Sequence, residues 1–263
     1  MELRESGLSF NGQHSMNDYN CYWIEDGGHP VAPANARPRY AIAGAGGRTI
    51  PVGPSISEAM EVSGTFVLQN EPANQIQAQM QLREIQKWLS GSGKLIFDYE
   101  PDKYYMATVD EIVDWSLRNW FGGEIGVTFR LEPYAYSLQR ITATGNLSAA
   151  TVGYECELTI EIPGIRDVPA ALEIVASSSN IGQVRTYVDG VQAYAWNGSL
   201  AHVRLYSEWP GLTGDEANYP IGTSLNTLWT QAPGQLLLHP GSNTVTIVTN
   251  NPGTVTVYAR PRW

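Results

Sequence analysis

The sequence predicts a mainly β protein made of two domains. Its 263 residues suit one large β domain or two of about 130 residues each. Hydrophobic residues make up 43% of the chain and charged residues only 16%, and its many Tyr, Trp, Thr and Val residues favour strands over helices. The residue pattern changes near Ser137, so we expect one domain over residues 1–137 and a second over residues 138–263.

The first domain is expected to begin with a strand and a tight turn. Leu8 and Phe10 alternate with polar residues, and the Asn-Gly pair in the following FNGQHS tolerates the positive φ that closes a hairpin. A further strand covers residues 60–68, where an apolar residue or Gly64 occupies every second position. This period of two predicts a strand with one buried face.

One helix is predicted after residue 72. Asn74 is a candidate N-cap, and Gly91 stands where a left-handed C-cap is expected. Between them five apolar residues recur at roughly helical spacing: Ile76, Met80, Ile85, Trp88 and Leu89. We expect this helix to cover one face of the sheet.

A hairpin and one more strand complete the first domain. Residues 95–97 and 105–109 are predicted to be two strands joined across Pro-Asp-Lys, and apolar residues alternate again over 127–131. Pro133 cannot donate a backbone hydrogen bond to a strand ladder, so we expect EPYAYS to end the domain near Ser137.

A segment poor in core residues lies over residues 27–54. It is rich in Gly, Pro and Ala, and Arg37, Arg39 and Arg48 are its only charged residues. Such a segment is typical of a surface loop or of a projecting hairpin whose order depends on a neighbour.

The second domain is expected to be a β-sandwich or jelly roll. Gly, Pro, Asn and Asp turns separate its short β runs, which cover residues 158–162, 172–176, 184–188, 203–206, 235–239, 245–248 and 255–259. The connection over residues 207–234 is too long for a hairpin and contains Trp209, Tyr219 and Trp229. These rings either bind a sugar or a partner protein or cap the core, and we expect at least one to be buried.

No pattern in the sequence indicates catalysis, a metal or a cofactor. The histidines show neither HxH nor HExxH spacing, there is no GxSxG elbow, and the glycines around residues 44–47 lack the Lys-Ser/Thr of a phosphate loop. Adjacent carboxylates such as Asp110 and Glu111 point to opposite faces of a strand, so they form no ready dyad. His239 is expected to end a strand before a turn, with nothing beside it to make it a base.

Charge and cysteine content narrow the partners and the compartment. The net charge of −10 argues against binding to DNA or to anionic membranes. Cys21 and Cys156 fall in different predicted domains without a CxxC spacing, so both are expected to be plain thiols. The start of the chain lacks a signal-peptide pattern and no run reaches about 18 apolar residues, so we expect synthesis in a reducing cytoplasm.

The first domain resembles the distal tail protein family of long-tailed bacteriophages. FNGQHSMNDYNCYW looks like the family's opening strand and turn, AIAGAGGRTIPVG like its Gly-rich hairpin, and REIQKWLSGSGKLIFDYEPDKYYMATV like its helix followed by a hairpin. The closing LLLHPGSNTVTIVTNNPGTVTVYARPRW looks like the end of the family's second, galectin-like sandwich domain.

This resemblance implies a structural virion protein without catalytic residues, cofactor or metal. It implies a hexameric ring at the tail tip that joins the tail tube protein to a tail-tip hub protein and carries receptor-binding proteins. DNA would pass through an acidic channel without specific binding, and no membrane insertion is implied. A hairpin arm over about residues 36–56 could close the ring on a neighbour's sheet edge through Arg37, Arg39, Tyr40, Arg48 and Ile50.

Two other functions remain open at the level of sequence. A carbohydrate-binding adhesin would act through the second domain and the aromatic residues Trp209, Tyr219 and Trp229. A cell-wall hydrolase would need paired acids or a metal site, for which the sequence gives no support.

Overall fold

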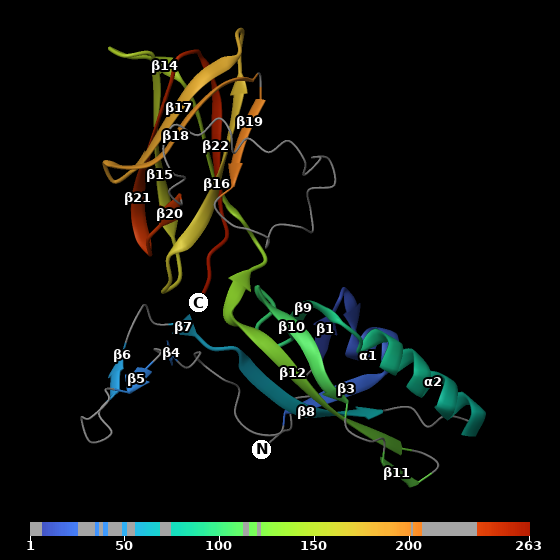
Figure 1. The fold of residues 1–263 in the computed structure, drawn as a ribbon. Helices are drawn as coiled ribbons and strands as arrows, with labels where there is room; N and C mark the ends of the chain where they lie inside the picture. Colours follow the sequence, from blue (N-terminus) through green and yellow to red (C-terminus); the bar gives the residue numbers. More distant parts are fainter. Residues whose placement is uncertain are drawn as a thin grey trace. The chain divides into compact units, whose positions relative to one another are not determined.

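The chain folds into two compact units, Met1–Tyr136 and Ser137–Trp263, in a computed structural model. The structure describes residues 7–25, 35–36, 39–41, 49–51, 56–68, 75–112, 116–119, 122–200, 202–206 and 236–263. The division between the units lies one residue before the boundary expected from the sequence. The fold is mainly β, as predicted (Figure 1).

The first unit is built on one eight-stranded sheet (Figure 1). Its strand order is β2-β1-β9-β10-β12-β8-β3, and β11 pairs with β12. The strands are β1 (Leu8–Phe10), β2 (Gln13–His14), β3 (Cys21–Glu25), β8 (Met60–Leu68), β9 (Ser92–Phe97), β10 (Lys103–Ile112), β11 (Ser116–Asn119) and β12 (Gly122–Ser137). They confirm the strands predicted around residues 8–10, 60–68, 95–97, 105–109 and 127–131.

β12 continues past Pro133 to the end of the unit. Its pairing with β8 ends at Leu131, opposite Met60, so the missing N–H of Pro133 costs no hydrogen bond on that side. The sheet also curls. Tyr99, in the turn after β9, donates a hydrogen bond of 2.6 Å to Glu25 at the end of the edge strand β3.

Helix α2 (Gln75–Trp88) covers one face of this sheet, as predicted. Ile85, Trp88 and Leu89 are buried, and the Trp88 indole N–H donates to the backbone oxygen of Phe10 at 2.9 Å. Gly91 follows the helix with φ +79°, which fits its predicted place in a left-handed C-cap. The predicted N-cap, Asn74, lies outside the described residues.

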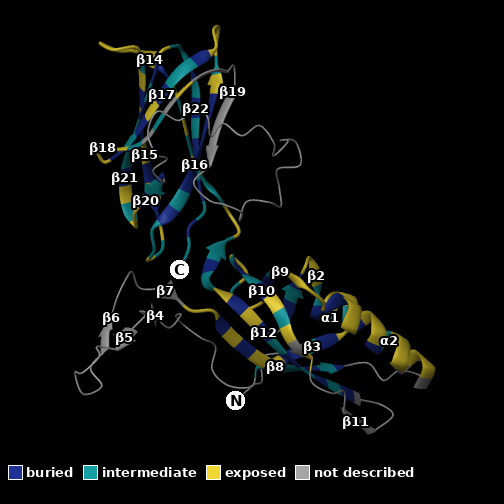
Figure 2. Ribbon diagram, viewed as in Figure 1, coloured by how far each residue is buried: buried dark blue, intermediate teal, exposed yellow. Residues whose placement is uncertain are grey.

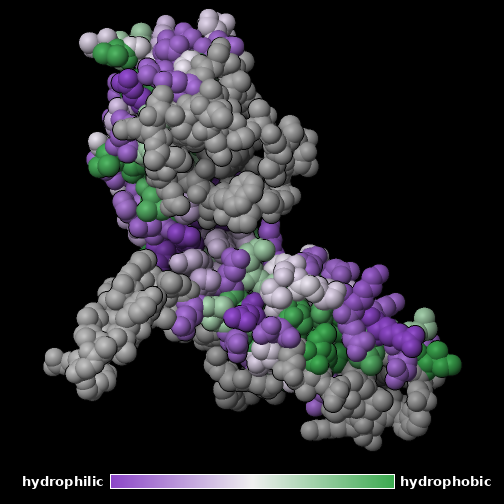
Figure 3. Space-filling view, viewed as in Figure 1, coloured by the Kyte–Doolittle hydropathy of each residue, from purple (hydrophilic) through white to green (hydrophobic). Residues whose placement is uncertain are grey.

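The assignment of Ile76 and Met80 to the buried face of the helix was wrong. Their exposed fractions are 72% and 59%, and Figure 3 shows hydrophobic surface at this end of α2. Five residues separate Met80 from Ile85, which turns an α-helix by about 500° and leaves the two side chains about 140° apart. The helix therefore buries Ile85, Trp88 and Leu89 against the sheet. It presents Ile76 and Met80 to solvent, on the side of α2 drawn yellow in Figure 2.

Aromatic side chains fill the space between the helix and the sheet. The ring of Trp23 lies 4.8 Å from that of Phe66 and 5.7 Å from that of Phe129, centroid to centroid. Gly64 sits beside them because it has no side chain. A Cβ there would lie 2.5 Å from the backbone oxygen of Ile24 and even closer to the Trp23 ring.

A short helix, α1 (Ser15–Tyr19), was not predicted. The Asn-Gly turn before it has the expected positive φ, +51° at Asn11 and +80° at Gly12, and it closes the β1–β2 hairpin. The sequence offered no helical period here because the helix has only five residues.

The second unit is a sandwich of two five-stranded sheets, which confirms the predicted architecture. One sheet has the order β13 (Ile141–Asn146), β22 (Gly253–Ala259), β16 (Val168–Ala176), β19 (His202–Tyr206), with β20 (Leu237–Leu238) paired to β16. The other has the order β14 (Ser148–Ala149), β15 (Tyr154–Ile162), β21 (Gly241–Thr249), β17 (Ile181–Val188), β18 (Val191–Leu200). Buried residues from both sheets, such as Ile174 and Ile247, form one core.

Three strands of the sandwich, β13, β14 and β18, were missed. Each lies at the edge of its sheet. An edge strand buries fewer side chains, so its alternation of apolar and polar residues is weak. Cys21 and Cys156 are buried free thiols in separate units, as predicted.

Candidate functional site

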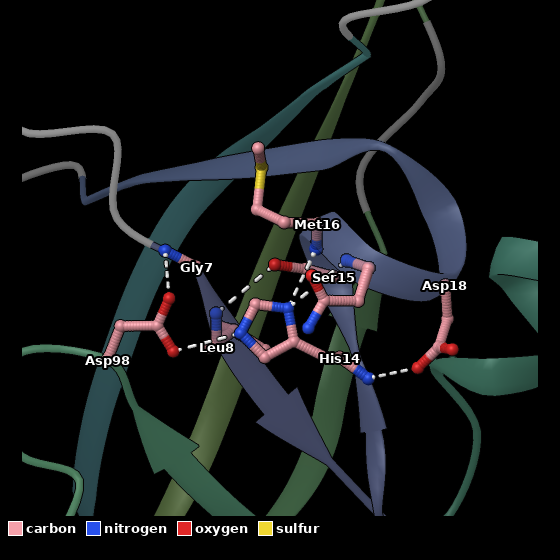
Figure 4. Close-up of polar contacts among 8 residues, drawn as sticks. Gly7, Leu8, His14, Ser15, Met16, Asp18 and Asp98 are labelled. Carbon is pink, nitrogen blue, oxygen red and sulfur yellow. Dashed lines mark hydrogen bonds and ion pairs between the residues drawn. The ribbon is translucent and has the colours of Figure 1, made fainter.

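Polar side chains gather where β2 meets α1 in the first unit (Figure 4). The His14 Nδ1 accepts hydrogen bonds from the backbone N–H groups of Met16 and Asn17, at 3.1 and 3.3 Å, and so caps α1. Its Nε2 lies 3.0 Å from an Asp98 carboxylate oxygen, and the other oxygen of Asp98 accepts from the Gly7 N–H at 3.0 Å. Because Nδ1 accepts, the proton of the neutral ring is on Nε2.

This cluster contains Ser, His and Asp but not a catalytic triad. Ser15 is fully buried, and its Oγ accepts a hydrogen bond from the Leu8 N–H at 3.1 Å. The imidazole nitrogen that would have to serve as a base instead holds the first turn of α1. The arrangement fixes β1, α1 and the β9–β10 turn to one another, which is a structural role.

A second polar cluster surrounds the β9–β10 turn. Tyr99 donates to Glu25, Tyr105 donates to Glu100 at 2.9 Å, and Lys103 donates to Glu100 at 2.6 Å. Burial raises the pKa of Tyr99 well above its ordinary value, and the hydrogen bond to Glu25 adds to the shift. Burial and the charge of Glu100 likewise raise the pKa of Tyr105. Both phenols therefore stay protonated as donors to carboxylates.

An open groove of about 580 Å³ lies between the β1–β2 turn, α1 and the C-terminal half of α2. The Tyr19 ring stacks on Trp88 with a centroid separation of 4.6 Å. Burial raises the pKa of Tyr19, and the negative charges of Asp18 and Glu84 raise it further. The groove is lined by Asn11, Gln13, Asp18, Tyr19, Glu84, Lys87, Trp88 and Ser90.

His239 lies in the turn between β20 and β21, as predicted, but it does have an acidic neighbour. Its Nδ1 is 2.9 Å from Asp167, which is 72 residues away in sequence and so could not be read from the local pattern. Both side chains are about half exposed. Asn243 accepts from the His239 N–H and donates to its carbonyl oxygen, so the group closes a turn.

The predicted arm contains two antiparallel strand pairs. β4 (Asn35–Ala36) pairs with β7 (Ile56–Ser57), and β5 (Arg39–Ala41) pairs with β6 (Thr49–Pro51), with Tyr40 opposite Ile50. The backbone thus places the predicted interface residues Arg39, Tyr40 and Ile50 in one hairpin. Arg37 and Arg48 lie outside the described residues.

The predicted binding residues of the second domain cannot be placed in the same way. Trp209, Tyr219 and Trp229 lie outside the described residues, and the adhesin alternative that depends on them stays a prediction. Within the described ranges, no group of three or more His, Cys, Asp or Glu residues could hold a metal ion. None of the helices described is long and apolar enough to cross a membrane.

Comparison with known proteins shows a relationship at the level of structure. No protein-family model matches the sequence, and no curated protein does. The fold is similar to that of the Dit protein of phage SPP1, described as a paradigm of the hub adsorption apparatus in phages that infect Gram-positive bacteria. The TM-score is 0.65 at 12% identity, over 98% of this chain and 99% of that chain. The chain has the Dit fold.

Two structures of the activated phage P2 baseplate show a weaker similarity. The TM-score is 0.51 at 8% identity for the structure with Ca, over 97% of this chain and 98% of that chain. It is 0.52 at 9% identity for the structure with Sr, over 97% of both chains. At these identities the similarity concerns the fold, and at that level it agrees with the resemblance seen in the sequence.

Proposed function

We propose that this chain is a structural protein of a phage tail tip, where it forms a hexameric ring. The similarity to SPP1 Dit carries the proposal, because it extends over both units and nearly the whole of both chains. A generic β-sandwich would match the second unit alone. The ring joins the tail tube protein to a tail-tip hub protein and carries receptor-binding proteins on its outside.

The first unit forms the ring, and the second unit is the galectin-like domain. The arm supports this assignment, since β4–β7 and β5–β6 pair within a segment whose sequence is rich in Gly, Pro and Ala. Arg37, Arg39, Tyr40, Arg48 and Ile50 take part in the contact between neighbouring copies. Closure by one arm per copy gives a heterologous interface, which is the kind that closes into a ring.

The described polar side-chain clusters have structural roles within the chain. The three histidine and tyrosine clusters above each fix turns and helix ends, and each uses its carboxylates as hydrogen-bond acceptors. The net charge of −10 suits a channel through which DNA passes without binding.

The oligomeric state of the purified chain tests the proposal. Light scattering coupled to size exclusion should give six copies per particle at high concentration, and negative-stain images should show a six-fold ring with a central channel. Particles of another order, or compact assemblies without a channel, would contradict it.

Deletion of Ala41–Val52 tests the arm. The variant should keep its far-UV spectrum and lose ring formation, whereas removal of Thr151–Val152, an exposed turn of the second unit, should leave the ring intact. Rings that persist without the arm would show that another element closes them.

A further inference from the structure

The groove between the β1–β2 turn, α1 and α2 has an aromatic wall that is held in place. The Tyr19 ring lies on the buried Trp88 with an angle of 18° between the ring planes. The Tyr19 hydroxyl donates to the Gln13 amide oxygen at 3.0 Å, and Gln81 donates to the Tyr19 carbonyl oxygen at 3.1 Å. Tyr19 itself is half-buried and lines the groove. Its ring is therefore positioned before any ligand arrives, which lowers the entropic cost of binding.

The polar side chains of the groove have hydrogen-bonding capacity that the fold does not use. Among the described residues, the side chains of Asn11, Glu84 and Lys87 have no hydrogen-bond or ion-pair partner, although all three line the groove. One carboxylate oxygen of Asp18 accepts from the His14 N–H at 2.6 Å (Figure 4). Its other oxygen has no partner in the same part of the chain. The groove thus presents both donors and acceptors beside an aromatic ring.

Shape and charge narrow the class of ligand. The volume of about 580 Å³ lies in the range of small-ligand sites, and the groove is open, so a ligand can extend beyond it. Asp18 and Glu84 each carry −1 and Lys87 carries +1, so the lining has a net charge of −1. This charge, on a chain that carries −10, disfavours a polyanion such as a nucleic acid or a phosphate polymer.

A neutral sugar fits both kinds of surface in the groove. Its hydroxyl groups donate and accept hydrogen bonds, so they can satisfy carboxylate, amide and ammonium groups together. Its C–H groups pack on an aromatic face, whose negative potential attracts them. A purely apolar ligand would instead take the polar side chains out of water without giving them partners.

We propose that this groove binds a neutral oligosaccharide. One sugar ring stacks on Tyr19, and its hydroxyl groups hydrogen-bond with Asp18, Glu84 and Asn11. The site belongs to the first unit and uses none of the aromatic residues that the sequence suggested for sugar binding. The inference goes beyond the ring function and does not depend on it, because one copy of the chain forms the whole groove. In a tail-tip protein such a site would contact surface polysaccharide of the host directly.

Saturation-transfer NMR on the full chain tests the proposal, because it detects weak binding. The probes are soluble oligosaccharides of glucose, of galactose, of rhamnose and of N-acetylglucosamine, with poly(glycerol phosphate) as an anionic comparison. We expect transfer from the protein to the C–H protons of at least one neutral oligosaccharide. Transfer to none of them, or to poly(glycerol phosphate) alone, would overturn the proposal.

Substitutions in the groove locate the sugar. Glu84→Ala and Tyr19→Ala should each weaken binding about tenfold, through loss of a charged hydrogen bond and of the stacking face. Tyr19→Phe keeps the face and should change binding little. Gln86→Ala is the matched control, since Gln86 is exposed on the same helix and does not line the groove. Binding that is unchanged in Glu84→Ala and Tyr19→Ala would place the sugar elsewhere and overturn the proposal.

Glu84→Ala keeps the test valid if Tyr19→Ala disturbs α1, because the Glu84 side chain has no partner among the described residues. A far-UV spectrum equal to that of the unchanged chain confirms that each variant is folded. Labelled tyrosine rings give a second reading. The signal of Tyr19, identified by its loss in Tyr19→Phe, should shift as the sugar is added. The signal of Tyr154, which is half-buried in the second unit, should not. A shift of Tyr154 alone would overturn the placement.

The two proposals can fail separately. Six-fold rings that bind no oligosaccharide would retain the proposed function and overturn this inference. Sugar binding in the groove by a chain that forms no ring would retain this inference and overturn the proposed assembly.

Discussion

The packing of α2 on the sheet should depend on Trp88. The substitution Trp88→Phe measures how much this residue contributes to the stability of the first unit. The substitution removes the indole N–H that donates to the Phe10 carbonyl oxygen at 2.9 Å, inside a region where both residues are buried. Loss of a buried hydrogen bond costs about 1–3 kcal/mol. The smaller ring also leaves a gap beside Phe66 and Tyr19, worth about 1 kcal/mol. The free energy of unfolding of the first unit should therefore fall by about 2–4 kcal/mol.

The assay is urea unfolding followed by far-UV circular dichroism. Because a chain with two compact units can unfold in more than one transition, hydrogen exchange of β1 and β9 peptides assigns the loss to the first unit. Tyr19→Phe is the matched control. It keeps the ring stacked on Trp88 and removes only the exposed hydrogen bond to Gln13, so it should change stability by about 0.5 kcal/mol or less.

A loss below about 1 kcal/mol for Trp88→Phe, or an equal loss for Tyr19→Phe, would refute this account of how α2 is held. A loss that appears in the exchange of second-unit peptides would refute it as well, since Trp88 has its contacts within the first unit.

Three further outcomes are expected. Gly64→Ala should cost about 1–3 kcal/mol, because the new methyl group meets Trp23 and a strand carbonyl; unchanged urea unfolding would contradict this. His14→Ala should cost about 1–2 kcal/mol and His14→Asn much less, because Asn can also cap α1; equal losses in thermal unfolding would argue against the cap. Burial raises the pKa of Cys21 to about 12, so its contribution to stability is complete below the pKa of the unfolded thiol, about 8.5, and falls as the pH rises towards 12. A Cys21→Ala variant should lack that part of the decline in urea titrations between pH 8 and 11.

Strands with one buried face were predictable from the sequence because their period of two is local. Residues 60–68 and 127–131 alternate clearly, since Phe66 and Phe129 face the same core. The edge strand β13 was not predictable, because none of its side chains is fully buried and only Ile141 and Ala143 of its six residues are apolar. The helix was found, but the face it buries was misjudged for Ile76 and Met80, because only the sheet decides which side of a helix is covered.

The polar clusters show the same division. The sequence indicated that His14 and His239 belong to no metal or catalytic motif, yet it could not show what each contacts. Asp98 lies 84 residues from His14, and Asp167 lies 72 residues from His239. Such pairs arise when the sheets form and bring distant turns together, and no local pattern records them.

By itself the sequence determined the mainly β class, the helix after residue 72, the composition of the arginine-bearing segment over residues 27–54 and the lack of a recognisable catalytic motif. These follow from composition, turn residues and the periodicity of apolar side chains, all of which act over a few residues. Only the tertiary structure decided which strands lie at the edges, which face of α2 is buried, and that Tyr99 joins an acidic turn to the end of β3. The reason is physical: burial and pairing are set by contacts between residues far apart in the chain, and these exist only after the sheet has curled and closed on its core.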